Sequence, residues 1–170
     1  MVIDPKAANQ FIEGYKSFLL YAGKIEREGS GSELLNQLAE GRDAFLEDPS
    51  LLEGFREQKE ETESWVFEAI ENIEVTNWIY LRDTTRYSLF IRGDQSAAFA
   101  VLGLTEPIRD IFGHSGLYLR TGVFPFGNRF VCDGLIESRI SLGAGYKKAF
   151  NESYREIKKE GRFFSSPTSA

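Results

Sequence analysis

The sequence predicts an α+β protein with three N-terminal helices, an antiparallel meander sheet of about five or six strands, and a C-terminal helix. Three observations carry this prediction. Apolar residues recur with a helical period up to about residue 75. After it, β-branched and aromatic runs alternate with turn residues, and a helical period returns after residue 143. Short connections between successive strand runs favour antiparallel pairing with helices on one face.

Three helices are expected within residues 1–75. The first has Asp4 as its cap and Pro5 in its first turn. Its apolar stripe consists of Phe11, Tyr15, Phe18, Ala22 and Ile25. Residues 29–32, Gly-Ser-Gly-Ser, end this helix and cap a second one, which carries Leu34, Leu35, Leu38 and Phe45. Pro49 and Ser50 begin a third, long helix whose middle, EQKEETE, is solvated.

Six runs after residue 75 have strand character, namely residues 76–83, 87–93, 97–104, 116–124, 129–132 and 135–142. Asp133-Gly134 predicts a tight hairpin between the last two. A short helix is expected over residues 106–113, with its start marked by Thr105 and Pro107. The first run is apolar on both faces, so we expect an interior strand or a strand with one face covered by a partner.

The last helix begins after Gly143-Ala144-Gly145 and stops at Gly161. We therefore predict a single domain over residues 1–170. Its parts are a helical acidic half (1–75), the sheet with the C-terminal helix (76–164) and a loose tail (165–170).

Charge is distributed unevenly within the net charge of −6. Residues 1–75 hold 7 Lys and Arg against 17 Asp and Glu, whereas residues 76–170 hold 13 against 9. The acidic half disfavours binding of nucleic acid or anionic lipid over the whole surface. The basic half leaves room for a local anion site.

Composition places the chain among ordinary globular proteins, with 42% apolar and 27% charged residues. Its single cysteine, Cys132, excludes an internal disulfide. The N-terminal residues do not resemble a secretory signal, and no run reaches the length of about 18 apolar residues that a membrane span requires. We expect a cytoplasmic protein without a membrane partner.

Residues for nucleophilic catalysis or metal binding are few. The only histidine, His114, lies in Gly-His-Ser-Gly, which lacks the spacing of a serine-hydrolase elbow. Cys132 lies in an apolar strand, where a thiol is typically an inert buried group. One His and one Cys exclude the common zinc sets, and the carboxylates lack calcium-loop spacing. We therefore predict no catalytic residue, no metal and no cofactor.

The start of the last helix is the candidate site for an anion. Gly143 and Gly145 precede Lys147 and Lys148 where an apparent strand passes into a helix. Free backbone N–H groups and lysines at such a point can hold a phosphate or carboxylate. Arg139, on the preceding strand, completes the predicted set. A plain strand-to-helix turn is the alternative interpretation, because no phosphate-loop or dinucleotide motif is present.

A surface for single-stranded nucleic acid is the second alternative. Strand alternation would put Trp78, Tyr80 and Arg82 on one side of the first strand. Aromatic and arginine side chains on one sheet face form stacking platforms for bases.

The segments VFPFGNRFVCDGLI and GAGYKKAFNESYREIKKEGRF are similar to those of a loose group of bacterial proteins with a PF…VYDGL segment and a C-terminal helix. The matching residues are Phe126, Val131, Asp133, Gly134, Leu135, Gly145, Lys147, Tyr154, Lys158 and Gly161, with Cys132 in place of tyrosine. This resemblance covers the second half of the chain and implies a shared fold without an assigned activity.

These observations predict a non-catalytic regulatory or protein-interaction module, with self-association as a homodimer or binding to another protein. The first alternative is an enzyme or binding protein for a small anionic ligand held at Gly143–Lys148. In the enzyme form, Asp133, Glu137 or Arg139 would position the ligand or transfer a proton. Nucleic-acid binding is the second alternative.

Overall fold

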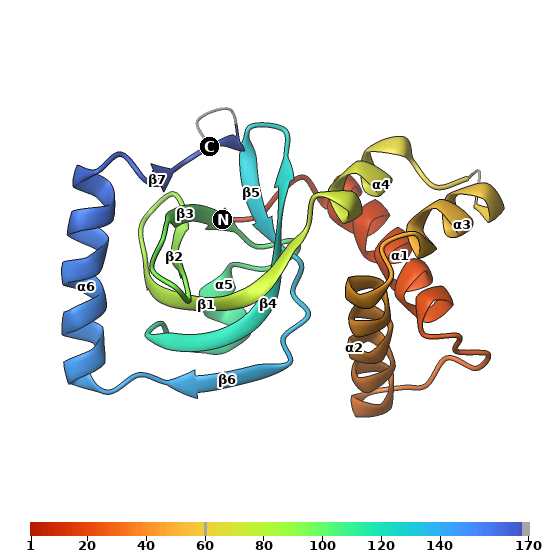
Figure 1. The fold of residues 1–170 in the computed structure, drawn as a ribbon, viewed down its shortest axis with the longest axis horizontal. Coiled ribbons are helices and arrows are strands. Elements are labelled where there is room, and N and C mark those ends of the chain that lie inside the picture. Colours follow the sequence, from red (N-terminus) through yellow and green to blue (C-terminus); the bar gives the residue numbers. More distant parts are fainter. Residues whose placement is uncertain (60, 168–170) are drawn as a thin grey trace. The chain divides into compact units, whose positions relative to one another are not determined.

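The computed structural model describes residues 1–59 and 61–167 and confirms the α+β class. The chain divides into two compact units (Figure 1). The helical unit is Asp4–Asn72, and the barrel unit is Met1–Ile3 with Ile73–Ala170. They differ in charge: the helical unit has 7 Lys and Arg against 16 Asp and Glu, and the barrel unit 13 against 10. Of the tail expected to be loose, residues 168–170 lie outside the described residues.

The helical unit contains α1 (Pro5–Ala22), α2 (Ser32–Glu47), α3 (Leu51–Gln58) and α4 (Ser64–Glu71). The Asp4 carboxylate accepts a hydrogen bond from Ala7 N at 3.0 Å, as expected for the cap of α1. The predicted third helix is two helices, α3 and α4. Its polar middle is where the helix stops.

Aromatic packing and one close helix crossing hold this unit together. The Phe18 ring lies 5.0 Å from that of Phe45 and 5.4 Å from that of Phe55. A β-carbon on Gly41 would lie 1.9 Å from the carbonyl oxygen of Leu19, so α1 and α2 approach too closely for any residue but glycine.

In the described part of the barrel unit there are seven strands and two helices. The strands are β1 (Glu74–Asp83), β2 (Ser88–Arg92), β3 (Ala98–Leu102), β4 (Leu117–Phe126), β5 (Arg129–Cys132), β6 (Ser138–Ser141) and β7 (Phe163–Phe164). The helices are α5 (Ile108–Phe112) and α6 (Ala144–Lys159), both at the predicted positions. None of the helices in the described residues has the length and apolarity that crossing a bilayer demands.

The sheet closes on itself and is not a simple meander. The order is β1-β2-β3-β5-β4, and β4 also pairs with β1. All these pairs are antiparallel except β3 with β5, which is parallel. A closed five-stranded Greek-key barrel of this order, with a helix between β3 and β4, has the topology of the OB-fold. In the view of Figure 1 α5 overlaps the ring of strands, and its Ile108 and Phe112 join the barrel core.

Both faces of β1 are covered within the barrel unit. Trp78 and Tyr80 point into the barrel and are fully buried. Ile79 and Leu81 point outward, where they pack with Tyr154 and Ile157 of α6. In Figure 1 α6 lies along the outside of the barrel. The two-faced strand is thus an interior strand, and it gives no reason to expect a partner on its second face.

Asp133-Gly134 does not form the predicted hairpin. β5 and β6 do not pair with each other, and both pair with the same side of β4. The pairing register shifts between Val123↔Cys132 and Arg120↔Ser138. Residues 133–137 therefore form a long bulge opposite Thr121 and Gly122 of β4. The tight hairpin lies instead at Gly127-Asn128, where Phe126 pairs with Arg129 and Gly127 has a φ of 55°.

Candidate functional site

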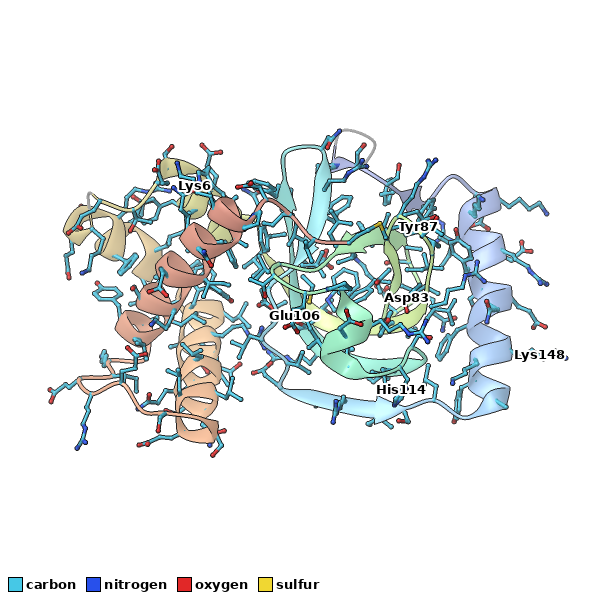
Figure 2. The ribbon with its side chains drawn as sticks, turned by 180° about the vertical axis from the view of Figure 1, so that it is seen from behind. Lys6, Asp83, Tyr87, Glu106, His114 and Lys148 are labelled. Carbon is cyan, nitrogen blue, oxygen red and sulfur yellow. The ribbon has the colours of Figure 1, made fainter. Side chains whose placement is uncertain are left out.

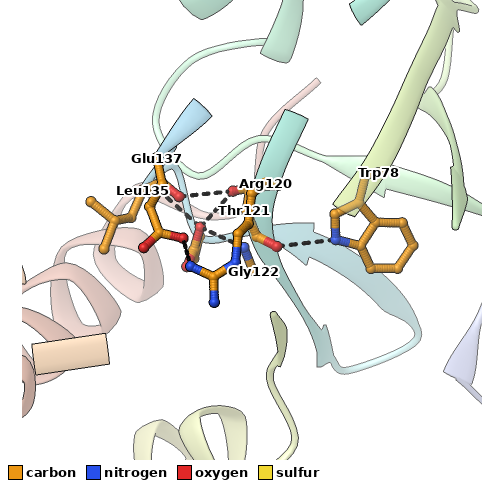
Figure 3. A network of polar contacts seen from close by, with 7 residues as sticks. Trp78, Arg120, Thr121, Gly122, Leu135 and Glu137 are labelled. Carbon is orange, nitrogen blue, oxygen red and sulfur yellow. Dashed lines mark hydrogen bonds and ion pairs between the residues drawn. The ribbon is translucent and has the colours of Figure 1, made fainter. Parts of the chain in front are cut away.

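The bulge after β5 is held by a buried group of polar atoms, the bulge cluster, formed by Thr121, Gly122, Asp133 and Leu135. Figure 3 labels Thr121, Gly122 and Leu135 of this cluster. The Asp133 carboxylate accepts hydrogen bonds from Thr121 Oγ1 at 2.9 Å, Gly122 N at 3.2 Å and Leu135 N at 2.9 Å. These bonds supply partners for backbone groups that the bulge removes from the strand ladder.

Neighbouring polar groups are tied to the same place. Trp78 Nε1 donates to the carbonyl oxygen of Thr121 at 3.0 Å, and Arg120 forms an ion pair with Glu137. Asp133 is 7% exposed and Thr121 is fully buried. The bulge cluster is therefore built like a structural element, with donors aimed at a fixed acceptor and little access for a ligand.

A hollow of about 540 Å³ beside α6 has the opposite character. The α6 hollow is lined by Arg82, Asn151, Tyr154, Arg155, Lys158 and Lys159. Four of these six side chains are cationic and none is acidic. Its volume is within the range of about 300–1,000 Å³ that is typical of small-molecule sites.

Arg82 reaches this hollow because of a bulge in β1. The register between β1 and β2 shifts between Tyr80 and Arg82, so Leu81 is the extra residue. Without the shift, alternation would turn Arg82 toward the barrel interior, where Tyr80 points. The bulge turns it outward to α6 instead, which is a recurrent way to re-aim a side chain.

Arg82 is held in place by neutral groups. Its Nη1 donates to Asn151 Oδ1 at 2.8 Å, and its guanidinium carbon lies 5.2 Å from the centre of the Tyr154 ring. Asn151 Nδ2 in turn donates to the carbonyl oxygen of Lys147 at 2.7 Å. Among the described residues, none of the four cations that line the α6 hollow forms an ion pair with a carboxylate. Their charge is therefore left for an external anion.

The acidic residue that follows Arg82 in the sequence, Asp83, is engaged elsewhere. Its carboxylate accepts a hydrogen bond from Tyr80 Oη at 2.6 Å and another from Ser88 Oγ at 2.7 Å. Burial raises the pKa of Tyr80, and the Asp83 carboxylate raises it further. Burial also raises the pKa of Tyr154.

The predicted anion residues lie at the other end of α6. Gly143 is the helix cap and Gly145 lies in the first turn. The Lys147 side chain lies over Gly116, and Lys148 points away from the barrel (Figure 2). Arg139 is not part of this group, because it lies on β6 opposite Leu119 and lines a different hollow. The N-terminal anion site stays a prediction.

The residues considered for catalysis lie in positions that do not favour catalysis, and those considered for base stacking do not share a face. His114 lies in an exposed loop between α5 and β4, with Nδ1 3.0 Å from the carbonyl oxygen of Ser115 (Figure 2). Cys132 is buried in the barrel core. Trp78 and Tyr80 are inside the barrel and Arg82 is outside, so the predicted stacking face of these three residues does not exist. Among the described residues, no group of three or more His, Cys, Asp and Glu could hold a metal ion.

A signal for the α6 hollow was present in the sequence. Lys147, Asn151, Arg155 and Lys158 are spaced by four, four and three residues, which puts them along one face of a helix. Applying the helical period to charges, and not only to apolar residues, would have found this face. The contribution of Arg82 depends on the β1 bulge, which has no such signal.

Comparisons of the chain with protein-family models, with curated proteins and with solved structures gave no match. The candidate site therefore rests on the geometry of the α6 hollow.

Proposed function

We propose that the chain is a non-catalytic binding module that holds a small phosphate-bearing ligand in the α6 hollow. The observation that carries this proposal is the Arg82 guanidinium, which is fixed by Asn151 and Tyr154 and has no carboxylate partner in the part of the chain that the structure describes. Elsewhere in the barrel unit Arg92 is paired with Glu74, and Arg162 with Glu160. A pre-positioned arginine among three further cations suits a ligand with several anionic oxygens.

Phosphate is favoured over a single carboxylate because of the number and kind of donors. Arg82 and Arg155 can each donate two parallel hydrogen bonds, and Lys158 and Lys159 add point charges. The Tyr154 ring adds a surface against which the Arg82 guanidinium lies. None of the six lining residues is a carboxylate, histidine or thiol, so the lining favours binding over proton transfer or nucleophilic attack.

The sheet face that usually binds ligands in barrels of this topology is covered by α6 in this chain. Barrels of this topology carry ligands on the outer face of β2 and β3. Here α6 packs on the outer face of β1 to β3, through Tyr154 and Ile157 against Ile79, Leu89 and Ala98. The helix therefore replaces the sheet face, and its own outward side presents the charges.

The test is calorimetric titration of the full chain with inorganic tripolyphosphate at low and at physiological salt. We expect Arg82→Gln, and a double variant Lys158→Gln with Lys159→Gln, each to weaken binding at least fivefold. Arg129→Gln is the matched control, because Arg129 is an exposed arginine on another part of the barrel. An equal loss in the control, or no heat with the unmodified chain, would refute the α6 hollow as the site.

A further inference from the structure

Within residues 1–59 and 61–167, the barrel leaves one strand of more than two residues with a free edge. β1 to β5 are each paired on both sides, whereas the pairing found for β6 in this part of the chain is with β4. Among the described residues, the other strand paired on one side is the two-residue β7. All four residues of β6 are exposed, and Ile140 is 64% exposed. Such an edge presents unpaired N–H and C=O groups to another strand.

The direction of these free groups follows from the ladder. Leu142 N donates to the carbonyl oxygen of Gly116 at 2.9 Å. Because an antiparallel ladder alternates, Ile140 and Ser138 face β4 with Leu142, and the backbone groups of Arg139 and Ser141 face outward. An added strand would therefore bond to Arg139 and Ser141 without disturbing the pairing with β4.

Side chains beside this edge define what the added strand would carry. Arg139 lies opposite Leu119, a barrel-core residue, and so points to the inner side of the sheet. There it lines a hollow of about 320 Å³, the edge hollow, with Ile111, Phe112, Ile136, Glu137 and Ser138. Glu137 is paired with Arg120. Arg139 has no carboxylate partner within the described residues.

The outer side of the edge is apolar. Ile140 lies opposite Tyr118, on the outer side of the sheet, and is exposed. Alternation in an added strand would thus put one apolar side chain next to Ile140. On the other side it would put an apolar group in the edge hollow and an acidic group two residues away, against Arg139.

We propose that β6 binds an extended segment of an acidic partner protein by strand addition, with one acidic side chain paired to Arg139 and one apolar side chain in the edge hollow. The charge of Arg139, within a barrel unit that has more cations than anions, favours an acidic partner over a second copy of the basic edge. The main-chain bonds of the edge supply affinity, and these two pockets supply selectivity. This binding is independent of the α6 hollow.

The probes are two blocked, fluorescein-labelled peptides. One is Thr-Thr-Leu-Val-Asp-Thr-Thr, and the other has Lys in place of Asp. Fluorescence anisotropy with the full chain should show tighter binding of the Asp peptide, by about fivefold or more, as expected for a change from opposite to like charges across strands. Arg139→Glu should reverse this preference, which a purely structural role of Arg139 would not do.

Ser141→Pro removes an outward N–H and keeps the bonds of β6 to β4, so it should weaken both peptides while the melting temperature is unchanged. Failure of the Asp peptide to bind, or a preference that Arg139→Glu leaves as it was, would overturn the proposal. So would a dimer in sedimentation that Ser141→Pro dissociates and the peptides do not, because the edge would then belong to a second copy.

Discussion

The barrel unit holds two groups of polar side chains that differ in how their charges are balanced. In the bulge cluster, the Asp133 carboxylate is buried and faces three donors at 2.9–3.2 Å. In the α6 hollow, four cations line an open space, and the partners that the described residues offer Arg82 are neutral. A buried charge with complete partners indicates a structural role, and an accessible, pre-positioned charge without a counter-ion indicates binding.

The comparison predicts that the two groups respond oppositely to mutation. Changes in the bulge cluster should lower stability, because buried donors lose their acceptor. Changes in the α6 hollow should leave stability unchanged and affect ligand binding.

The largest effect is expected for Asp133→Ala. The change leaves Thr121 Oγ1 and the N–H groups of Gly122 and Leu135 without this acceptor, so the free energy of unfolding should fall by about 3 kcal/mol or more. Urea denaturation and hydrogen exchange of the β4 and β5 amides measure this loss. Asp133→Asn keeps one acceptor oxygen and should lose less. Equal losses for both variants would contradict the assigned role of the carboxylate.

A second test uses space next to the same carboxylate. A β-carbon on Gly122 would lie 2.4 Å from Asp133 Oδ2 and 2.6 Å from Ile73 Cδ1. Gly122→Ala should therefore lower the free energy of unfolding by about 1–3 kcal/mol through overpacking. Gly145→Ala is the matched control: no atom lies within 4 Å of its new methyl group, and a helix position favours alanine. The control should be neutral or more stable, and a loss as large as that of Gly122→Ala would refute the overpacking argument.

The Tyr80 side chain provides a pH test of the hydrogen bonds that the Asp83 carboxylate accepts. Its pKa is raised in the folded chain, so the phenol ionises in the unfolded chain first. The protonated phenol makes its full contribution to the free energy of unfolding below the ordinary tyrosine pKa of about 10. Above that pH the free energy of unfolding should fall by up to about 1.4 kcal/mol per pH unit. Tyr154, whose pKa is also raised, adds to this slope. Tyr80→Phe should make the alkaline slope shallower in urea titrations from pH 9 to 11, and an unchanged slope would contradict the shift.

The sequence predicts the helices and strands of this fold better than it predicts how the strands pair to close the barrel. Asp4, Pro107 and Gly161 mark helix ends by local chemistry, and the six strand runs correspond to β1–β6. The split between α3 and α4, the parallel pairing of β3 with β5 and the bulges at Leu81 and Asp133 depend on partners far away in the chain. A bulge reverses every side chain after it, so Arg82 could not be assigned to its face by alternation.

The candidate sites follow the same division. The charged face of α6 was visible in the sequence as a helical period. The predicted anion site, however, used only residues at the N-terminal end of this helix. A comparison of the two ends of α6 separates these hypotheses. If the N-terminal site binds the anion, Lys147→Ala with Lys148→Ala should abolish tripolyphosphate binding. We expect a smaller loss from that pair than from Lys158→Gln with Lys159→Gln.

The smallest effect on stability is expected in the α6 hollow itself. Lys158 and Lys159 are exposed and make no ion pair within the described residues, so Lys158→Gln with Lys159→Gln should change the free energy of unfolding by less than about 0.5 kcal/mol. Relief of repulsion from Arg82 and Arg155 could even raise it slightly at low salt, and added salt should remove that gain. Urea denaturation of the double variant at two salt concentrations measures both effects. A loss as large as that of Asp133→Ala would make these lysines structural, and the contrast between the two groups of polar side chains would no longer identify the binding site.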